Sequence, residues 1–71
     1  MRAEKALREF ATVRQNDPNY VPAYQMAAQT LMNLGRSDEA RPLLEQGIAS
    51  AERSGNRHAA AEMQGMLDEM A

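Results

Sequence analysis

The sequence predicts an all-α fold of four helices that pack as antiparallel hairpins. Apolar residues recur at steps of three and four along most of the chain, a spacing that places them on one face of a helix. Short segments rich in Gly, Pro, Asn and Asp interrupt this pattern three times, and such segments separate one helix from the next. We expect helices over residues 2–16, 20–34, 38–54 and 57–70, within a single domain of residues 1–71.

The first expected helix, residues 2–16, has one apolar side and charged residues around the remainder. Glu4 and Arg8 are four positions apart, in the order that favours an ion pair along a helix. Pro18 predicts the end of the helix, because a residue that precedes proline is disfavoured in the helical conformation. The apolar side consists of Ala3, Ala6, Leu7, Phe10 and Val13.

The second and third expected helices, residues 20–34 and 38–54, form one hairpin. Gly35 can end the second helix in the left-handed conformation, and Ser37 can cap the third. Since the connection is so short, the two helices must run antiparallel. The apolar faces are Tyr24, Ala27, Ala28, Leu31 and Leu34 in the second helix and Ala40, Leu44, Gly47, Ile48 and Ala51 in the third.

Two residues of the third helix conflict with local helix preferences. Pro42 lacks a backbone donor, so we expect a tightened or slightly kinked first turn. Gly47 costs about 1 kcal/mol relative to alanine, and close approach of a neighbouring helix would explain its place on the apolar face. Gly55 is expected to end this helix and Asn56 to cap the fourth. Met63, Met66 and Met70 then lie along one side of the fourth helix, where packing against the third is the favoured interpretation.

Composition excludes several classes of function. The net charge is −2 with both signs interleaved, which argues against a nucleic-acid partner. The chain has no cysteine, and His58 is the sole histidine, so we expect no metal, no cofactor and a surface role for His58. No nucleophile–base–acid constellation is present, so we expect no catalytic residues and no enzyme activity. Met1 is followed by charged residues and no apolar run, so we expect neither a signal peptide nor a membrane span, and no membrane partner. Because the chain has no cysteine, we expect a reduced, cytoplasmic location.

A repeat of 34 residues underlies the helical pattern. Ala6, Phe10 and Val13 are followed 34 positions later by Ala40, Leu44 and Gly47. The spacing Tyr24-x2-Ala27-Ala28-x2-Leu31 and the spacing Ala40-x3-Leu44 resemble the tetratricopeptide repeat, whose pattern is W-x2-L-G-x2-Y, then A-x3-F, then P. Ala6-x3-Phe10 with Pro18 is similar to the second half of a preceding repeat. Tyr24 replaces Trp, Ala27-Ala28 replaces Leu-Gly, and Glu52 stands where a second closing proline would fall.

This resemblance implies a right-handed α-α superhelix that binds a protein or peptide partner without catalysis. The first helix of each repeat lines a concave groove in such arrays, which here assigns the groove to the second and fourth helices. A stripe of polar residues on these helices is the candidate partner-binding surface, since amides can pair with an extended peptide backbone. The alternative is that they are ordinary solvated positions. The residues are Gln25, Gln29, Asn33, Gln64 and Asp68.

The chain holds fewer than two repeats, although about three are usually needed for a stable array. Two explanations stay open: the chain is a fragment of a longer array, or two copies associate and supply the missing layer. The second explanation predicts a homodimer that contacts the open side of the first helix. Its candidate self-association residues are Leu7, Phe10, Val13 and Tyr20.

Overall fold

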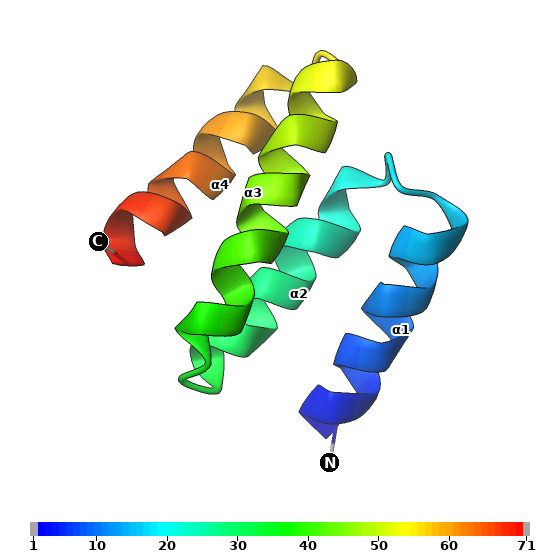
Figure 1. The fold of residues 1–71 in the computed structure, drawn as a ribbon, viewed down its shortest axis with the longest axis vertical. Coiled ribbons are helices and arrows are strands. Elements are labelled where there is room, and N and C mark those ends of the chain that lie inside the picture. Colours follow the sequence, from blue (N-terminus) through cyan, green and yellow to red (C-terminus); the bar gives the residue numbers. More distant parts are fainter. Residues whose placement is uncertain (1, 71) are drawn as a thin grey trace.

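The computed structural model describes residues 2–70 and confirms an all-α fold of four helices. The helices are α1 (Arg2–Asn16), α2 (Val21–Asn33), α3 (Ser37–Arg53) and α4 (Arg57–Met70). Each helix packs antiparallel against the next one along the chain (Figure 1). The expected second and third helices, 20–34 and 38–54, differ from α2 and α3 by one residue at each end.

A left-handed glycine makes the sharp corner between α2 and α3. Gly35 has a φ of 75°, a conformation that residues with a Cβ rarely adopt. The Gly35 N–H donates to the Met32 carbonyl at 3.0 Å, and the Arg36 N–H donates to the Leu31 carbonyl at 2.8 Å. These two bonds form a Schellman motif, which satisfies carbonyls that the helix end would otherwise leave unpaired.

The prediction that Ser37 caps α3 is wrong. Ser37 is already the first residue of α3, and Arg36 occupies the capping position without a side-chain hydrogen bond to the helix. The corner is so tight that Arg36 has both roles: its N–H completes the Schellman motif of α2, and it directly precedes α3. Ser37 is therefore already inside the helix that it was expected to cap. The next corner repeats this geometry at Gly55, whose φ is 73°. There Asn56 does cap, because its Oδ1 accepts the Ala59 N–H of α4 at 3.1 Å.

The core lies between α2, α3 and α4. No residue of α1 is buried, so this helix covers the core from one side only. The predicted apolar faces of α2 and α3 are buried except at two positions: Leu34 lies past the end of α2 and is exposed, and Ile48 is only partly buried. The buried residues are Val21, Ala23, Tyr24, Ala27, Ala28 and Leu31 of α2, Ala40, Leu44, Gly47, Ser50 and Ala51 of α3, and Ala59 and Met63 of α4.

Gly47 confirms the expected close approach of helices. A Cβ built on Gly47 would lie 2.7 Å from Tyr24 Cβ of α2 and 2.6 Å from Met63 Sδ of α4. Gly47 is therefore the point where α3 fits between its two neighbours. Pro42, by contrast, sits exposed inside α3, and the helix continues past it without a break.

The connector between α1 and α2 is tied to the core through one carbonyl. The Pro18 carbonyl accepts a hydrogen bond from Tyr24 Oη at 2.8 Å and a second from Ser50 Oγ at 3.2 Å. Ser50 is fully buried, so this bond satisfies a hydroxyl that would be costly to leave unpaired. Tyr24 is thus a core aromatic residue with a bonded hydroxyl, as its position on the apolar face predicts.

Candidate functional site

Four of the five candidate partner-binding residues form two similar side-chain pairs on the surface, one between two amides on α2 and one between an amide and a carboxylate on α4. Gln29 Nε2 donates to Asn33 Oδ1 at 3.0 Å on α2. Gln64 Nε2 donates to Asp68 Oδ1 at 3.1 Å on α4. All four residues are exposed, whereas Gln25 is half-buried. We refer to these five residues as the amide face; within residues 2–70 no hydrogen bond joins its α2 members to its α4 members.

The surface near the amide face also has an apolar member that the sequence did not single out. Met26 is 52% exposed and follows Gln25 directly on α2. Met32, the other methionine of α2, is partly buried and packs against the core instead. An exposed thioether next to amide side chains gives a partner both apolar contact and hydrogen-bonding groups.

The candidate self-association residues on and after α1 fall into two groups. Leu7 packs against the core and Phe10 is partly buried, so neither points freely to solvent. Val13 and Tyr20 are 36% and 49% exposed. Val13 and Tyr20 are therefore accessible to a second copy of the chain, whereas Leu7 already packs against the core of its own chain.

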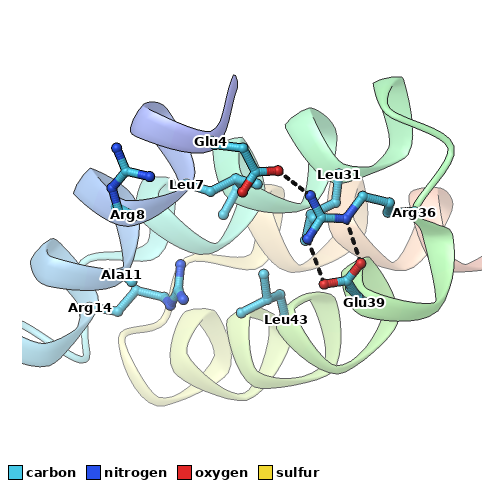
Figure 2. Close-up of a pocket in the computed structure, with 10 residues that line it drawn as sticks. Glu4, Leu7, Arg8, Ala11, Arg14, Leu31, Arg36, Glu39 and Leu43 are labelled. Atoms are coloured by element: carbon cyan, nitrogen blue, oxygen red, sulfur yellow. Dashed lines mark hydrogen bonds and ion pairs between the residues drawn. The ribbon is translucent and has the colours of Figure 1, made fainter. Parts of the chain in front are cut away.

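An ion-pair cluster that the sequence did not predict joins α1 to the corner between α2 and α3. Arg36 Nε and Nη2 bind both carboxylate oxygens of Glu39, at 2.5 and 2.8 Å, and Arg36 Nη1 binds Glu4 of α1 (Figure 2). The expected pairing of Glu4 with Arg8 does not form. The hydrogen bond from Arg36 holds the pKa of Glu39 below its usual value, and the bonds from Glu39 and then Glu4 raise the pKa of Arg36.

A groove with a volume of about 300 Å³ runs between α1 and α3, with α2 as its floor (Figure 2). The Arg36 cluster stands at one end, where Glu4 begins the α1 wall. Apolar side chains form the floor and part of each wall, while Arg8 and Arg14 add positive charge along α1. The groove is lined by Glu4, Leu7, Arg8, Ala11, Arg14, Ala27, Leu31, Arg36, Glu39 and Leu43.

Arg14 is the least satisfied polar residue of this groove. Its Nη1 is buried and has no hydrogen-bond partner, and its guanidinium carbon lies 5.8 Å from the centre of the Tyr24 ring. The sequence alone groups Arg14 with the charged residues that surround the apolar side of α1. A signal for its true position was present, because Arg14 follows Leu7 by seven residues, or about two helical turns on the same face.

The remaining polar candidates give no enclosed site. The His58 side chain is 86% exposed, and its Nε2 lies 3.5 Å from Glu62 Oε1. Residues 2–70 contain no group of three or more His, Cys, Asp or Glu side chains placed to hold a metal ion. None of the four helices combines the length and the apolar character needed to cross a membrane.

Comparison with known families agrees with this architecture. The family model described as tetratricopeptide repeat matches residues 2–65, which is most of the chain. The chain belongs to the tetratricopeptide repeat family. Tetratricopeptide repeats generally act as scaffolds for protein–protein interaction, and α2 with α3 forms the complete repeat here. Searches of curated proteins and of solved structures gave no significant match.

Proposed function

We propose that this chain is a non-catalytic scaffold that binds a protein or peptide partner on the amide face. The main support for the proposal is that the same arrangement, a glutamine hydrogen-bonded to a polar residue four positions later, occurs on two helices. Gln29 with Asn33 on α2, and Gln64 with Asp68 on α4, are exposed and hydrogen-bonded in the same direction. Membership of the tetratricopeptide repeat family supports a binding role of this kind.

The amide face suits a polar peptide backbone. A paired glutamine keeps one N–H and its carbonyl oxygen available, so it can still donate to and accept from a partner strand. The pairing along the helix also restricts the side-chain rotamers before a partner arrives, which lowers the entropy lost on binding. Met26 adds an exposed apolar contact near these groups.

The test compares two double variants that remove the same chemistry from different places. Gln25→Ala with Gln29→Ala removes amides from the amide face, and Gln15→Ala with Gln46→Ala removes exposed amides from α1 and α3. Proteins captured from cell extract by each immobilised variant are quantified by mass spectrometry, and each variant's melting temperature is measured by circular dichroism. We expect a set of captured proteins to be lost only with the first pair, at an unchanged melting temperature. Equal capture by both pairs would show that the amide face is not the binding surface.

Self-association through α1 is the second candidate function. It is favoured by the fact that α1 buries no residue while Val13 and Tyr20 stay exposed. Light scattering over a range of protein concentrations measures the molar mass directly. A dimer that Val13→Asp converts to monomer supports this candidate, with exposed Gln15→Asp as the charge-matched control. A monomer at every concentration removes it.

A further inference from the structure

The groove between α1 and α3 is lined by Arg14, a partly buried arginine whose guanidinium forms no ion pair within residues 2–70. Arg14 Nη1 is shielded from water and has no acceptor among the residues described. A buried donor left unpaired costs about 1–3 kcal/mol, and more when the group is charged. The Tyr24 ring beneath the guanidinium offsets only part of this cost, since a ring face attracts a cation but accepts no strong hydrogen bond.

The charges of the groove are unequally distributed along α1. At the Glu4 end, Arg36 is already shared by two carboxylates. Toward the other end, Arg8 and Arg14 form no ion pair within residues 2–70. The groove therefore attracts a negative group at its Arg14 end and disfavours one near Glu4 and Glu39.

We propose that this groove binds a peptide segment of a partner protein, with an acidic side chain of that segment bound to Arg14. A carboxylate is the planar acceptor that matches the guanidinium fork, and Arg14 lines the groove and is only partly buried, so a carboxylate in the groove can reach its side chain. Leu7, Leu31 and Leu43 provide an apolar surface for the neighbouring residues of the segment. The occupant is therefore an acidic residue flanked by apolar ones.

The dimensions of the groove agree with a short extended segment. Its α1 wall runs from Glu4 to Arg14, about 15 Å at the rise of an α-helix. Four or five residues of extended peptide cover about that length at 3.3–3.6 Å per residue.

This site is separate from the amide face. Ala27 and Leu31 form the groove floor on α2, and Gln29 lies between them in sequence. At 3.6 residues per turn, Gln29 projects about 160° away from both of them. A ligand in the groove and a partner on the amide face therefore contact opposite sides of α2, and either site can fail without the other.

The experiment is a titration of the isotope-labelled chain, followed by NMR, with the peptide acetyl-Ala-Leu-Glu-Leu-Ala-amide. The matched probes are the same peptide with Gln in place of Glu, and sodium acetate. We expect saturable shifts of the Arg14 side-chain Nε–H and of groove amides such as Leu7 and Leu43 with the Glu peptide. The Gln peptide should bind at least tenfold more weakly, and acetate should show no saturation at the same concentrations.

Variants assign the effect to the guanidinium. Arg14→Met should abolish the shifts, and Arg14→Lys, which keeps the charge without the fork, should weaken binding while the fold stays intact. Arg41→Met removes an exposed arginine of α3 outside the groove and should leave binding unchanged.

Five outcomes would overturn the proposal. Equal shifts with the Glu and Gln peptides would show that binding does not require the carboxylate. Equal affinity for acetate would show that binding does not require the peptide. Unchanged binding by Arg14→Lys would show that the Arg14 guanidinium is not the group that binds the peptide. Shifts confined to the amide face would show that the groove is not the binding site. Groove shifts that follow the protein's own concentration without peptide would identify the occupant as a second copy.

Discussion

Replacing Gly47 by alanine has two opposing effects on the free energy of unfolding, one from helix propensity and one from packing of the added Cβ. Alanine is about 1 kcal/mol more favourable than glycine inside a helix, so propensity alone predicts a stabilised α3. The added Cβ, however, would meet Tyr24 Cβ at 2.7 Å and Met63 Sδ at 2.6 Å. Cβ atoms essentially never approach so closely, so something in the core must move.

The two contacts differ in how easily they relax. Met63 ends in a flexible thioether that can rotate away. Tyr24 Cβ is attached directly to the α2 backbone, so relief there requires α2 and α3 to separate. Extra volume in a packed core costs about 1–3 kcal/mol, and the contact with Tyr24 Cβ, which no side-chain rotation relieves, places this substitution in the upper half of that range, above the propensity gain. We therefore expect Gly47→Ala to lower the free energy of unfolding by about 1–2 kcal/mol, or about 5–15 °C in melting temperature for a domain of this size.

Gly65 provides the matched control, because it lies in α4 with no atom within 4 Å of a built Cβ. Gly65→Ala should raise the free energy of unfolding by about 0.5–1 kcal/mol through the same propensity gain. Both variants are measured by urea unfolding and thermal melting, followed by circular dichroism at 222 nm. If Gly47→Ala proves as stable as the parent chain or more stable, the close helix contact at Gly47 is not a tight fit and the reasoning fails.

Three further predictions test the connector, a cap and the ion-pair cluster. Tyr24→Phe removes the hydroxyl bonded to the Pro18 carbonyl and should cost about 0.5–1.5 kcal/mol in urea unfolding, whereas Tyr24→Ala should cost about 3 kcal/mol or more by emptying the core; equal costs would mean that the ring does not pack. Asn56→Ala should cost about 1 kcal/mol, and Ser37→Ala should cost less because Ser37 caps nothing; the opposite order would contradict the observed caps. The folded-state pKa of Glu39 is depressed, so its contribution to stability is present above the ordinary glutamate pKa of about 4.3 and is lost as the pH falls through the folded-state value. Melting temperatures between pH 6 and pH 3 should therefore fall less for Glu39→Gln than for the parent chain, and parallel curves would exclude a contribution from this pair.

The fold was predictable because its signals are local and agree with one another. Apolar spacing placed Tyr24 and Leu44 in the core, and glycine followed by a polar residue placed both tight corners. The errors are local too. Leu34 continues the apolar spacing but lies beyond the last turn of α2, and Ser37 has the right chemistry for a cap but stands one residue too late.

The groove was not predictable from the sequence to the same degree. Glu4 and Arg36 are 32 positions apart, and nothing in their spacing favours this pairing over that of Glu4 with Arg8. Which pair forms depends on how α1 lies across the corner between α2 and α3, a property of tertiary packing. Likewise, the sequence alone gives Arg14 as a surface charge. Its place near the Tyr24 ring, with Nη1 buried, depends on how α1 packs against α2.

The two sides of α2 therefore offer different chemistry to a partner. One side presents amides that suit a peptide backbone, and the other presents a guanidinium above apolar side chains that suits an acidic residue. Tyr24 supports the guanidinium side, because its ring lies near Arg14 while its hydroxyl holds the connector that leads into α2. Because the sites point in opposite directions from one rigid helix, occupying one leaves the other accessible. If both proposed sites bind their partners, the same helix connects two of them with no change in the shape of the chain.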